Sequence, residues 1–115
     1  MVKDLAFTVY SVSDMPRAIA FYRDVIGLKP GDMFGERYAE FEVGRNIFAV
    51  GNGESIGIKP GSQFSVAFEV DDLDGMRQRL LDKGVDVTEI YDSETCKSAF
   101  VTDPDGNKFG IHRLK

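Results

Sequence analysis

Phe7-Thr8-Val9-Tyr10-Ser11-Val12-Ser13-Asp14 has the same layout as Ser65-Val66-Ala67-Phe68-Glu69-Val70-Asp71-Asp72, which begins 58 positions later. Both stretches run through β-branched and aromatic residues to a valine and an acidic residue, and a helical pattern closed by glycine follows each of them. A repeat of this length indicates two copies of one supersecondary unit, neither of which buries its apolar face alone. The 115-residue chain therefore divides into two halves, and we expect function where they meet.

Both halves have the pattern of a βαβββ module, so the predicted fold class is α+β. In the first half, the predicted elements are a strand over 5–12, a helix from the cap Asp14 to the stop Gly27, and strands over 38–43 and 46–50. In the second half, they are a strand over 64–70, a helix over 73–83 before the stop Gly84, and strands at about 85–90, 98–102 and 107–113. A Gly-, Ser- and Pro-rich linker over about 51–63 separates module 1 (about 1–57) from module 2 (about 64–115) in a single predicted domain, 1–115.

Composition excludes several classes of function. The formal net charge of −5, without any cluster of Lys and Arg, argues against nucleic-acid binding. No apolar run approaches the length of a membrane span, and no apolar segment of the signal-peptide type follows Met1. A single cysteine, Cys96, forms no disulfide within the chain. We therefore expect a cytoplasmic protein without membrane or nucleic-acid partners.

Three stretches resemble the signatures of the vicinal oxygen chelate superfamily. They are Val12-Ser13-Asp14-Met15-Pro16-Arg17-Ala18-Ile19-Ala20-Phe21-Tyr22-Arg23-Asp24-Val25-Ile26-Gly27-Leu28, Val70-Asp71-Asp72-Leu73 and Phe100-Val101-Thr102-Asp103-Pro104-Asp105-Gly106-Asn107. That superfamily includes glyoxalase I, bleomycin-resistance proteins, fosfomycin-resistance thiol transferases and extradiol dioxygenases. The resemblance implies paired βαβββ modules whose sheets curve into a U-shaped trough.

In the metal-dependent members, the first and last strands of each module supply the four metal ligands. The resemblance places those four positions at Phe7, Ala49, Ser65 and Gly110. None is His, Asp or Glu, and a neutral serine hydroxyl alone is a poor ligand for zinc or nickel. We therefore expect no metal and no cofactor, and the chain is nearest in character to the metal-free bleomycin-resistance branch.

Strand alternation predicts which side chains line the trough. Small side chains at Ala49, Ser65 and Gly110 predict a cavity, and aromatic walls with a few acids suit a flat or cationic small molecule. The predicted ligand-binding residues are Phe7, Tyr38, Glu40, Ala49, Ser65, Phe100, Gly110 and His112.

Two of these residues, Glu40 and His112, are also the candidates for catalysis. Glu40 has two interpretations of equal weight, contact with a ligand and simple solvation at the trough mouth. His112 is either a general base or ligand contact, or a histidine touching solvent at a strand end. Cys96 is predicted in a loop over 91–97, where the adjacent Lys97 favours its thiolate, but its role stays open.

Three functions remain open at the level of sequence. The first is a metal-free protein that binds a small molecule, as in antibiotic resistance by sequestration. The second is a lyase, isomerase, thiol transferase or dioxygenase of the same fold with non-standard site residues, and the third is an interaction module without a ligand. Exposed sheet edges favour a homodimer, in which the modules pair within one chain or swap between chains.

Overall fold

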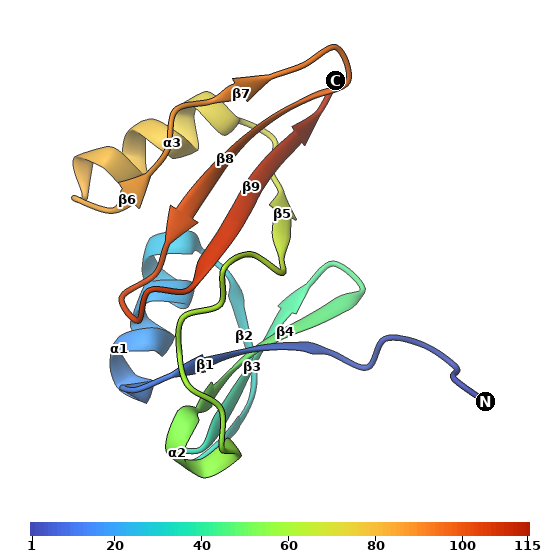
Figure 1. Ribbon diagram of the computed structural model, residues 1–115, viewed down its shortest axis with the longest axis vertical. Helices are drawn as coiled ribbons and strands as arrows, with labels where there is room; N and C mark the ends of the chain where they lie inside the picture. The colour runs from blue at the N-terminus through green and yellow to red at the C-terminus, as the bar shows by residue number, and fades with distance from the viewer. The chain divides into compact units, whose positions relative to one another are not determined.

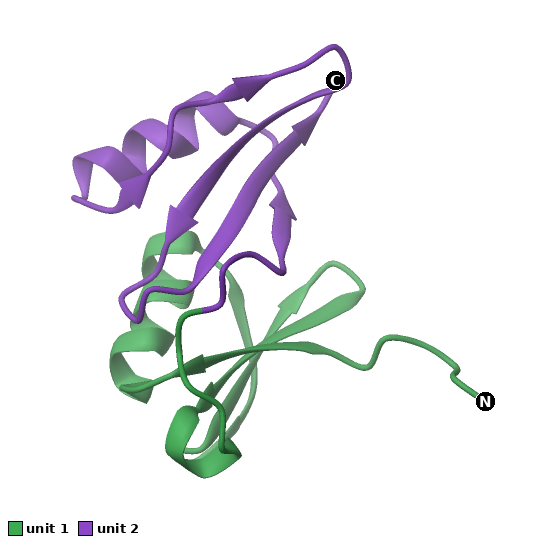
Figure 2. Cartoon of the chain, in the orientation of Figure 1, with its two compact units in different colours: residues 1–61 green, residues 62–115 purple.

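The computed structural model describes all 115 residues, and its contacts divide the chain into two compact units, Met1–Gly61 and Ser62–Lys115 (Figure 2). Each unit contains one mixed β-sheet and a helix that packs on it (Figure 1). This confirms the predicted α+β fold built from two βαβββ-like modules. None of the helices is long and apolar enough to cross a membrane. That the units make up one domain over 1–115 stays a prediction.

Unit 1 is built around a four-stranded sheet of order β1-β4-β3-β2, in which only the β1–β4 pair is parallel. Its elements are β1 (Thr8–Val12), α1 (Met15–Ala20), the π-helical turn η1 (Phe21–Ile26), β2 (Lys29–Phe34), β3 (Tyr38–Val43), β4 (Asn46–Asn52) and α2 (Gly53–Ile56). The Asp14 side chain accepts a hydrogen bond from the Arg17 N–H at 3.0 Å, so it caps α1 as predicted. Gly27 ends the helical segment at φ 89°, a left-handed conformation that favours glycine.

Unit 2 repeats this plan with a sheet of order β5-β9-β8-β6, while β7 pairs with another part of β8. Its elements are β5 (Ala67–Glu69), α3 (Leu73–Asp82), β6 (Asp86–Val87), β7 (Tyr91–Asp92), β8 (Cys96–Thr102) and β9 (Lys108–Leu114). As in unit 1, the first strand runs parallel to the last, here β5 to β9. Asp72 caps α3 by accepting from the Gly75 N–H at 3.0 Å, and Gly84 follows the helix at φ 74°.

The helix-facing side of each sheet forms the core of its unit. In unit 1, the fully buried Tyr22 of η1 lies 5.0 Å from Phe48 and 6.3 Å from Phe41, measured between ring centroids. Complete burial of a large apolar side chain contributes about 1.5–3 kcal/mol to stability. In unit 2, the core side chains come from α3, β8 and β9: Leu73, Leu80, Ala99, Val101, Phe109 and Ile111. The alternation of strand residues between the core and the other face agrees with the sequence prediction.

The segment expected as a linker over 51–63 is partly structured, which corrects the prediction. Strand β4 continues to Asn52, whose side chain then accepts hydrogen bonds from the N–H groups of Glu54 and Ser55 at 3.0 and 3.2 Å. This cap starts the short helix α2. The composition of this segment predicted a linker, because composition does not reveal that Asn52, between Gly51 and Gly53, caps a helix.

Strand β2 was not among the segments predicted from the sequence. It contains Pro30 and Gly31, residue types that are poor strand formers in sheet interiors. Both are tolerated here because β2 lies at the edge of its sheet, and its pairing with β3 shifts register between Pro30 and Met33.

The predicted loop over 91–97 is wrong at both ends, and only residues 93–95 lie outside strands. Tyr91 and Asp92 form β7, which pairs with Ser98 and Lys97 of β8, so Cys96 is the first residue of a strand rather than a loop residue. The strands predicted over 64–70 and 85–90 shorten to β5 and β6. The side chains around Cys96 are therefore determined by the pairing of β7 with β8, two strands joined by a short turn.

A buried asparagine joins the start of unit 2 to the turn before β9. Asn107 is fully buried, and its Oδ1 accepts from the Ser62 N–H at 2.8 Å while its Nδ2 donates to Asp103 Oδ2 at 3.0 Å. The Asp103 carboxylate in turn accepts from the N–H groups of Asp105 and Asn107. The amide therefore satisfies both a backbone donor and a buried carboxylate.

We predict that Asn107→Ala lowers the free energy of unfolding by about 1–3 kcal/mol, because these buried groups lose their partner. Urea denaturation measures the change. The matched control is Asn46→Ala, at the exposed first residue of β4, where we expect a loss below about 0.5 kcal/mol. Equal losses in the two variants would contradict the role given to Asn107.

Candidate functional site: the open sheet faces

The open face of the sheet in unit 1 carries an aromatic cluster around Tyr38. The Tyr38 ring lies 5.9 Å from the ring of Phe7 and 5.7 Å from that of Phe34, measured between centroids. We call Phe7, Phe34 and Tyr38 the first aromatic cluster. Phe7 and Tyr38 were predicted site residues, whereas Phe34 was missed because β2 was not recognised; it pairs with Tyr38 across β2 and β3.

Glu40 lies beside this cluster and is hydrogen-bonded to it. The Tyr38 hydroxyl donates to Glu40 Oε2 at 3.0 Å. Burial first, and then this hydrogen bond and the charge of Glu40, raise the pKa of Tyr38 to about 12. Tyr38 is therefore a protonated donor at neutral pH. Ala49, the β4 partner of Glu40, is completely buried in the sheet.

The open face of the sheet in unit 2 carries a corresponding aromatic cluster. The Phe100 ring lies 5.0 Å from the ring of Phe64 and 5.9 Å from that of Tyr91, both in edge-to-face arrangements. We call Phe64, Tyr91 and Phe100 the second aromatic cluster. Only Phe100 was a predicted site residue. Phe64 and Tyr91 were not predicted. A single aromatic residue just before a strand, as at Phe64, is too common a pattern to indicate a site.

Gly110 lies under the second cluster, and the space above it is filled. A Cβ atom at Gly110 would lie 3.2 Å from Cε1 of Phe64 and 3.2 Å from the Cβ of Ala67. The cavity expected from the small residue at 110 is therefore occupied by the Phe64 ring. Ser65, which follows Phe64 in the chain, is exposed, and its hydroxyl lies 3.0 Å from that of Ser62.

His112 contacts a different acid from the one considered in the sequence. Its Nδ1 lies 2.5 Å from Oε1 of Glu69, the residue opposite it on β5. Hydrogen bonds to Glu69, and then to Cys96, raise the pKa of His112. The hydrogen bond from the Leu114 N–H, and then that from His112, lower the pKa of Glu69. Within its own unit, His112 is thus part of a polar group with Glu69 and Cys96, and Glu40 is paired with Tyr38.

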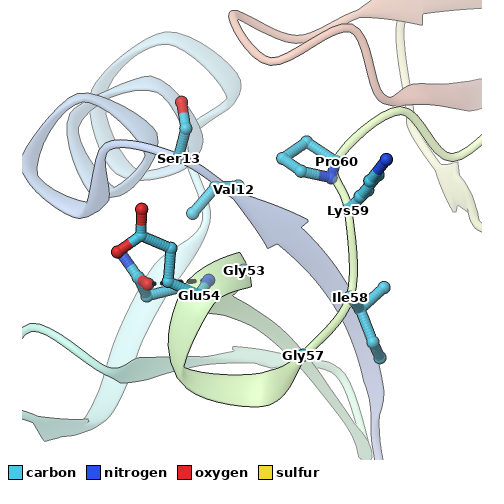
Figure 3. A pocket seen from close by; sticks show the side chains of 9 residues that line it. Val12, Ser13, Gly53, Glu54, Gly57, Ile58, Lys59 and Pro60 are labelled. Carbon is cyan, nitrogen blue, oxygen red and sulfur yellow. Dashed lines mark hydrogen bonds between the residues drawn. The ribbon is translucent and has the colours of Figure 1, made fainter.

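A cavity of about 320 Å³ lies elsewhere in unit 1, beside α2 (Figure 3). Figure 3 shows the segment from Gly57 to Pro60 on one side of it and Val12 and Ser13 on another. The wall is fixed by the Ser11 hydroxyl, which donates to the Ile58 carbonyl at 2.5 Å. None of the predicted site residues lines this cavity. Its lining residues are Val12, Ser13, Asn52, Gly53, Glu54, Gly57, Ile58, Lys59 and Pro60.

Residues 4–111 match the family model of the Glyoxalase/Bleomycin resistance protein/Dioxygenase superfamily. The chain belongs to this superfamily. The match covers both units, and it confirms the resemblance inferred from the helix and turn signatures.

Several relatives within the superfamily cover nearly the whole chain. A metallothiol transferase FosB from Lysinibacillus sphaericus is 32% identical over an alignment of 118 positions, which covers 96% of this chain and 82% of that protein. Among solved structures, TnmS3, an antibiotic binding protein from Streptomyces sp. CB03234, matches with a TM-score of 0.83 at 23% identity over 99% and 98% of the two chains. A lactoylglutathione lyase from Agrobacterium tumefaciens matches with a TM-score of 0.82 at 20% identity over 97% and 94%. At these identities, the two structures show the fold alone.

The metal site of the metal-dependent superfamily members does not fit this chain. Phe7, Ala49 and Gly110 have no side-chain donor atom, and the Ser65 hydroxyl interacts with that of Ser62. No group of three or more His, Cys, Asp or Glu side chains is arranged to hold a metal ion. Hard or borderline divalent ions need several such ligands. The four ligand positions therefore supply no cradle for an ion.

We predict that Glu40→Gln lowers the pKa of Tyr38 from about 12 toward its ordinary value of 10.0, because a neutral amide no longer opposes the phenolate charge. The pKa stays above 10.0, since burial is the larger cause. NMR titration of the tyrosine ring carbons measures it. Glu42→Gln is the control, because Glu42 lies two residues along β3 and is paired with Lys29 at 3.5 Å. An unchanged Tyr38 titration in Glu40→Gln would refute the coupling.

Proposed function

We propose that this protein is a metal-free small-molecule binding protein of the glyoxalase/bleomycin-resistance type, which holds an aromatic or cationic ligand. The observation that carries the proposal is the pair of aromatic clusters, one on the open face of each sheet. Four of the six side chains are well exposed, whereas Tyr38 and Phe100, at the centre of each cluster, are half-buried. The exposed fractions are 48% for Phe7, 55% for Phe34, 52% for Phe64 and 61% for Tyr91.

Clusters of exposed rings suit flat ligands because stacking and edge-to-face contacts add to the burial of apolar surface. They also suit cations, which are attracted to the ring faces. In the first cluster, the Glu40 carboxylate lies next to the Tyr38 ring and adds negative charge. The net charge of −5 also attracts cations to the protein as a whole. The proposed contact residues are therefore Phe7, Tyr38 and Glu40 in unit 1, with Phe34 beside them, and Phe100 in unit 2, with Phe64 and Tyr91 beside it.

One observation supports binding without a metal, and one structural relative supports binding of a small molecule. The four positions that carry metal ligands in metal-dependent members hold Phe7, Ala49, Ser65 and Gly110. The structural relative TnmS3 is an antibiotic binding protein. A role in antibiotic resistance by sequestration, as a homodimer, is part of the proposal.

We predict that the purified protein binds bleomycin or a flat cationic dye such as ethidium, and that Phe34→Ala and Tyr91→Ala each weaken binding about tenfold or more. The physical reason is the loss of ring contact, worth about 1–3 kcal/mol with the lost burial. Isothermal titration calorimetry measures affinity, and thermal shift measures stabilisation, which is roughly 2.7 kcal/mol at 100 times the dissociation constant. Sedimentation velocity on the same samples shows whether the binding species is a dimer.

The matched control is Leu81→Ala, which removes an exposed apolar side chain from α3 and leaves both clusters intact. Binding should then stay within about twofold of that of the original protein. No binding across the panel, with or without added Zn²⁺, Ni²⁺ or Mn²⁺, would refute the proposal and favour an interaction module without a ligand. Binding that needs one of these ions would refute its metal-free form.

The second candidate is thiol transfer, and the relationship to FosB favours it. The relative from Lysinibacillus sphaericus is a metallothiol transferase with 32% identity to this chain. The assay mixes the protein with fosfomycin, a low-molecular-weight thiol and each divalent ion in turn, and it follows loss of free thiol. Turnover that disappears without metal would establish this function. The absent ligands lead us to expect none.

A further inference from the structure

Three side chains with complementary chemistry form a row across β5, β9 and β8 of unit 2. Glu69 on β5 is the pairing partner of His112 on β9, and His112 is opposite Ser98 on β8. Cys96 lies two residues before Ser98 on the same strand, so its side chain is on the same face. Figure 1 shows these three strands side by side in the second half of the chain.

The contacts within this row fix the histidine ring. His112 Nδ1 lies 2.5 Å from Glu69 Oε1, and the other carboxylate oxygen accepts from the Leu114 N–H at 2.7 Å. Because Glu69 is held at both oxygens, it orients the ring and leaves Nε2 as the ring nitrogen that it does not engage. Cys96 lies opposite Leu114, two residues from His112 on β9, so the thiol and the imidazole are diagonal neighbours on one face of the sheet. A nucleophile, a base in reach of it and a third group that orients the base are the recurring parts of an activated thiol.

The protonation behaviour of the row agrees with its geometry. Hydrogen bonds to Ser93, and then to His112, lower the pKa of the Cys96 thiol. The Ser93 hydroxyl lies 3.6 Å from the sulfur. Since the pKa of His112 is raised by Glu69 and then by Cys96, both changes favour the thiolate beside an imidazolium.

The other charged groups around the row have partners of their own. Lys97 points to the opposite face of β8 and lies 3.5 Å from Asp74 of α3. Lys115 lies 2.5 Å from Asp92 of β7. Arg113 donates to the Asp71 carbonyl, and its charge contributes to the lowered pKa of Glu69. The sequence interpretation that Lys97 favours the thiolate is therefore replaced by one in which His112 and Ser93 do so.

We propose that Cys96, His112 and Glu69 form a nucleophilic thiol site that is alkylated by small α,β-unsaturated carbonyl compounds. The Cys96 thiol gives its proton to His112. The thiolate sulfur then forms a bond to the β-carbon, and the π electron pair of the C=C bond moves to the α-carbon. The α-carbon takes the proton from the His112 imidazolium, so the step needs no oxidant or further reactant. Glu69 acts only through His112 and is a positioning residue.

None of the three residues belongs to an aromatic cluster, although Tyr91 lies opposite Ser98 at the edge of the row, so the site extends the proposed function and can be tested separately. The probe is N-ethylmaleimide, an α,β-unsaturated carbonyl compound, applied to the full chain. Cys96 is the only cysteine, so the gain in intact mass reports its modification alone. The rate is measured across pH, because its inflection reports the pKa of the reacting thiol.

We predict an inflection below the ordinary thiol value of 9.0 for the original protein, and a shift to higher pH in His112→Gln and in Glu69→Gln. At pH 7, both variants should react about threefold or more slowly. For each unit of pKa change, the thiolate fraction changes about tenfold and the intrinsic reactivity about threefold in the opposite direction. Lys97→Gln, next to Cys96 but on the other face, is the matched control and should keep the original profile.

Two outcomes would overturn the proposal. One is an inflection of the alkylation rate at the same pH in the original protein, His112→Gln and Lys97→Gln. The other is a rate lowered equally at every pH in the histidine variant, which would indicate altered access to Cys96 rather than altered ionisation. Thermal denaturation checks the fold of each variant. If His112→Gln does not fold, the profile of Glu69→Gln decides, because it retains the histidine and a side chain of the same shape.

Discussion

The parallel pairing of first and last strands is the constraint on which each unit depends. β1 pairs with β4 in unit 1, and β5 pairs with β9 in unit 2. Parallel neighbours cannot be joined by a tight turn, so the chain crosses over through a helix that covers one face of the sheet. The other face keeps its alternate side chains uncovered by that helix. The last strand then lies between two neighbours, which is why Ala49 is flanked by Val9 and Glu40.

Equivalent strand positions in the two units hold side chains of different chemical type. The position of Glu40 in unit 1 corresponds to that of Phe100 in unit 2, because they lie opposite Ala49 and Gly110. Likewise, the pair Glu69 and His112 occupies the place held in unit 1 by Ser11 and Gly51. A duplicated backbone therefore does not imply a duplicated site. Unit 1 combines aromatic rings with a carboxylate, whereas unit 2 places Tyr91 opposite Ser98, next to the row of Glu69, His112 and Cys96.

The helices could be predicted from the sequence because their ends depend on local groups. Asp14 and Asp72 each accept a hydrogen bond from an N–H three residues away, and a glycine just after each helical segment, Gly27 or Gly84, ends it. The site could be predicted only in part, since its geometry comes from pairing between distant segments. The strand position of Cys96 depends on a hairpin register, and the ring of Phe64 lies on a residue 46 positions later. Alternation predicted the correct face for such residues, but not their neighbours.

Gly110 links the loss of the metal ligands to the aromatic surface. A Cβ there would lie 3.2 Å from Phe64 and from Ala67, closer than an unstrained contact between carbon atoms. Any metal-binding side chain at this position begins with a Cβ, so the Phe64 ring that packs edge-to-face on Phe100 would have to shift. In unit 2, the metal ligand and the aromatic cluster therefore compete for one space. Gly110 thus leaves room for the Phe64 ring at a position where the resemblance to the metal-dependent members implies a metal ligand.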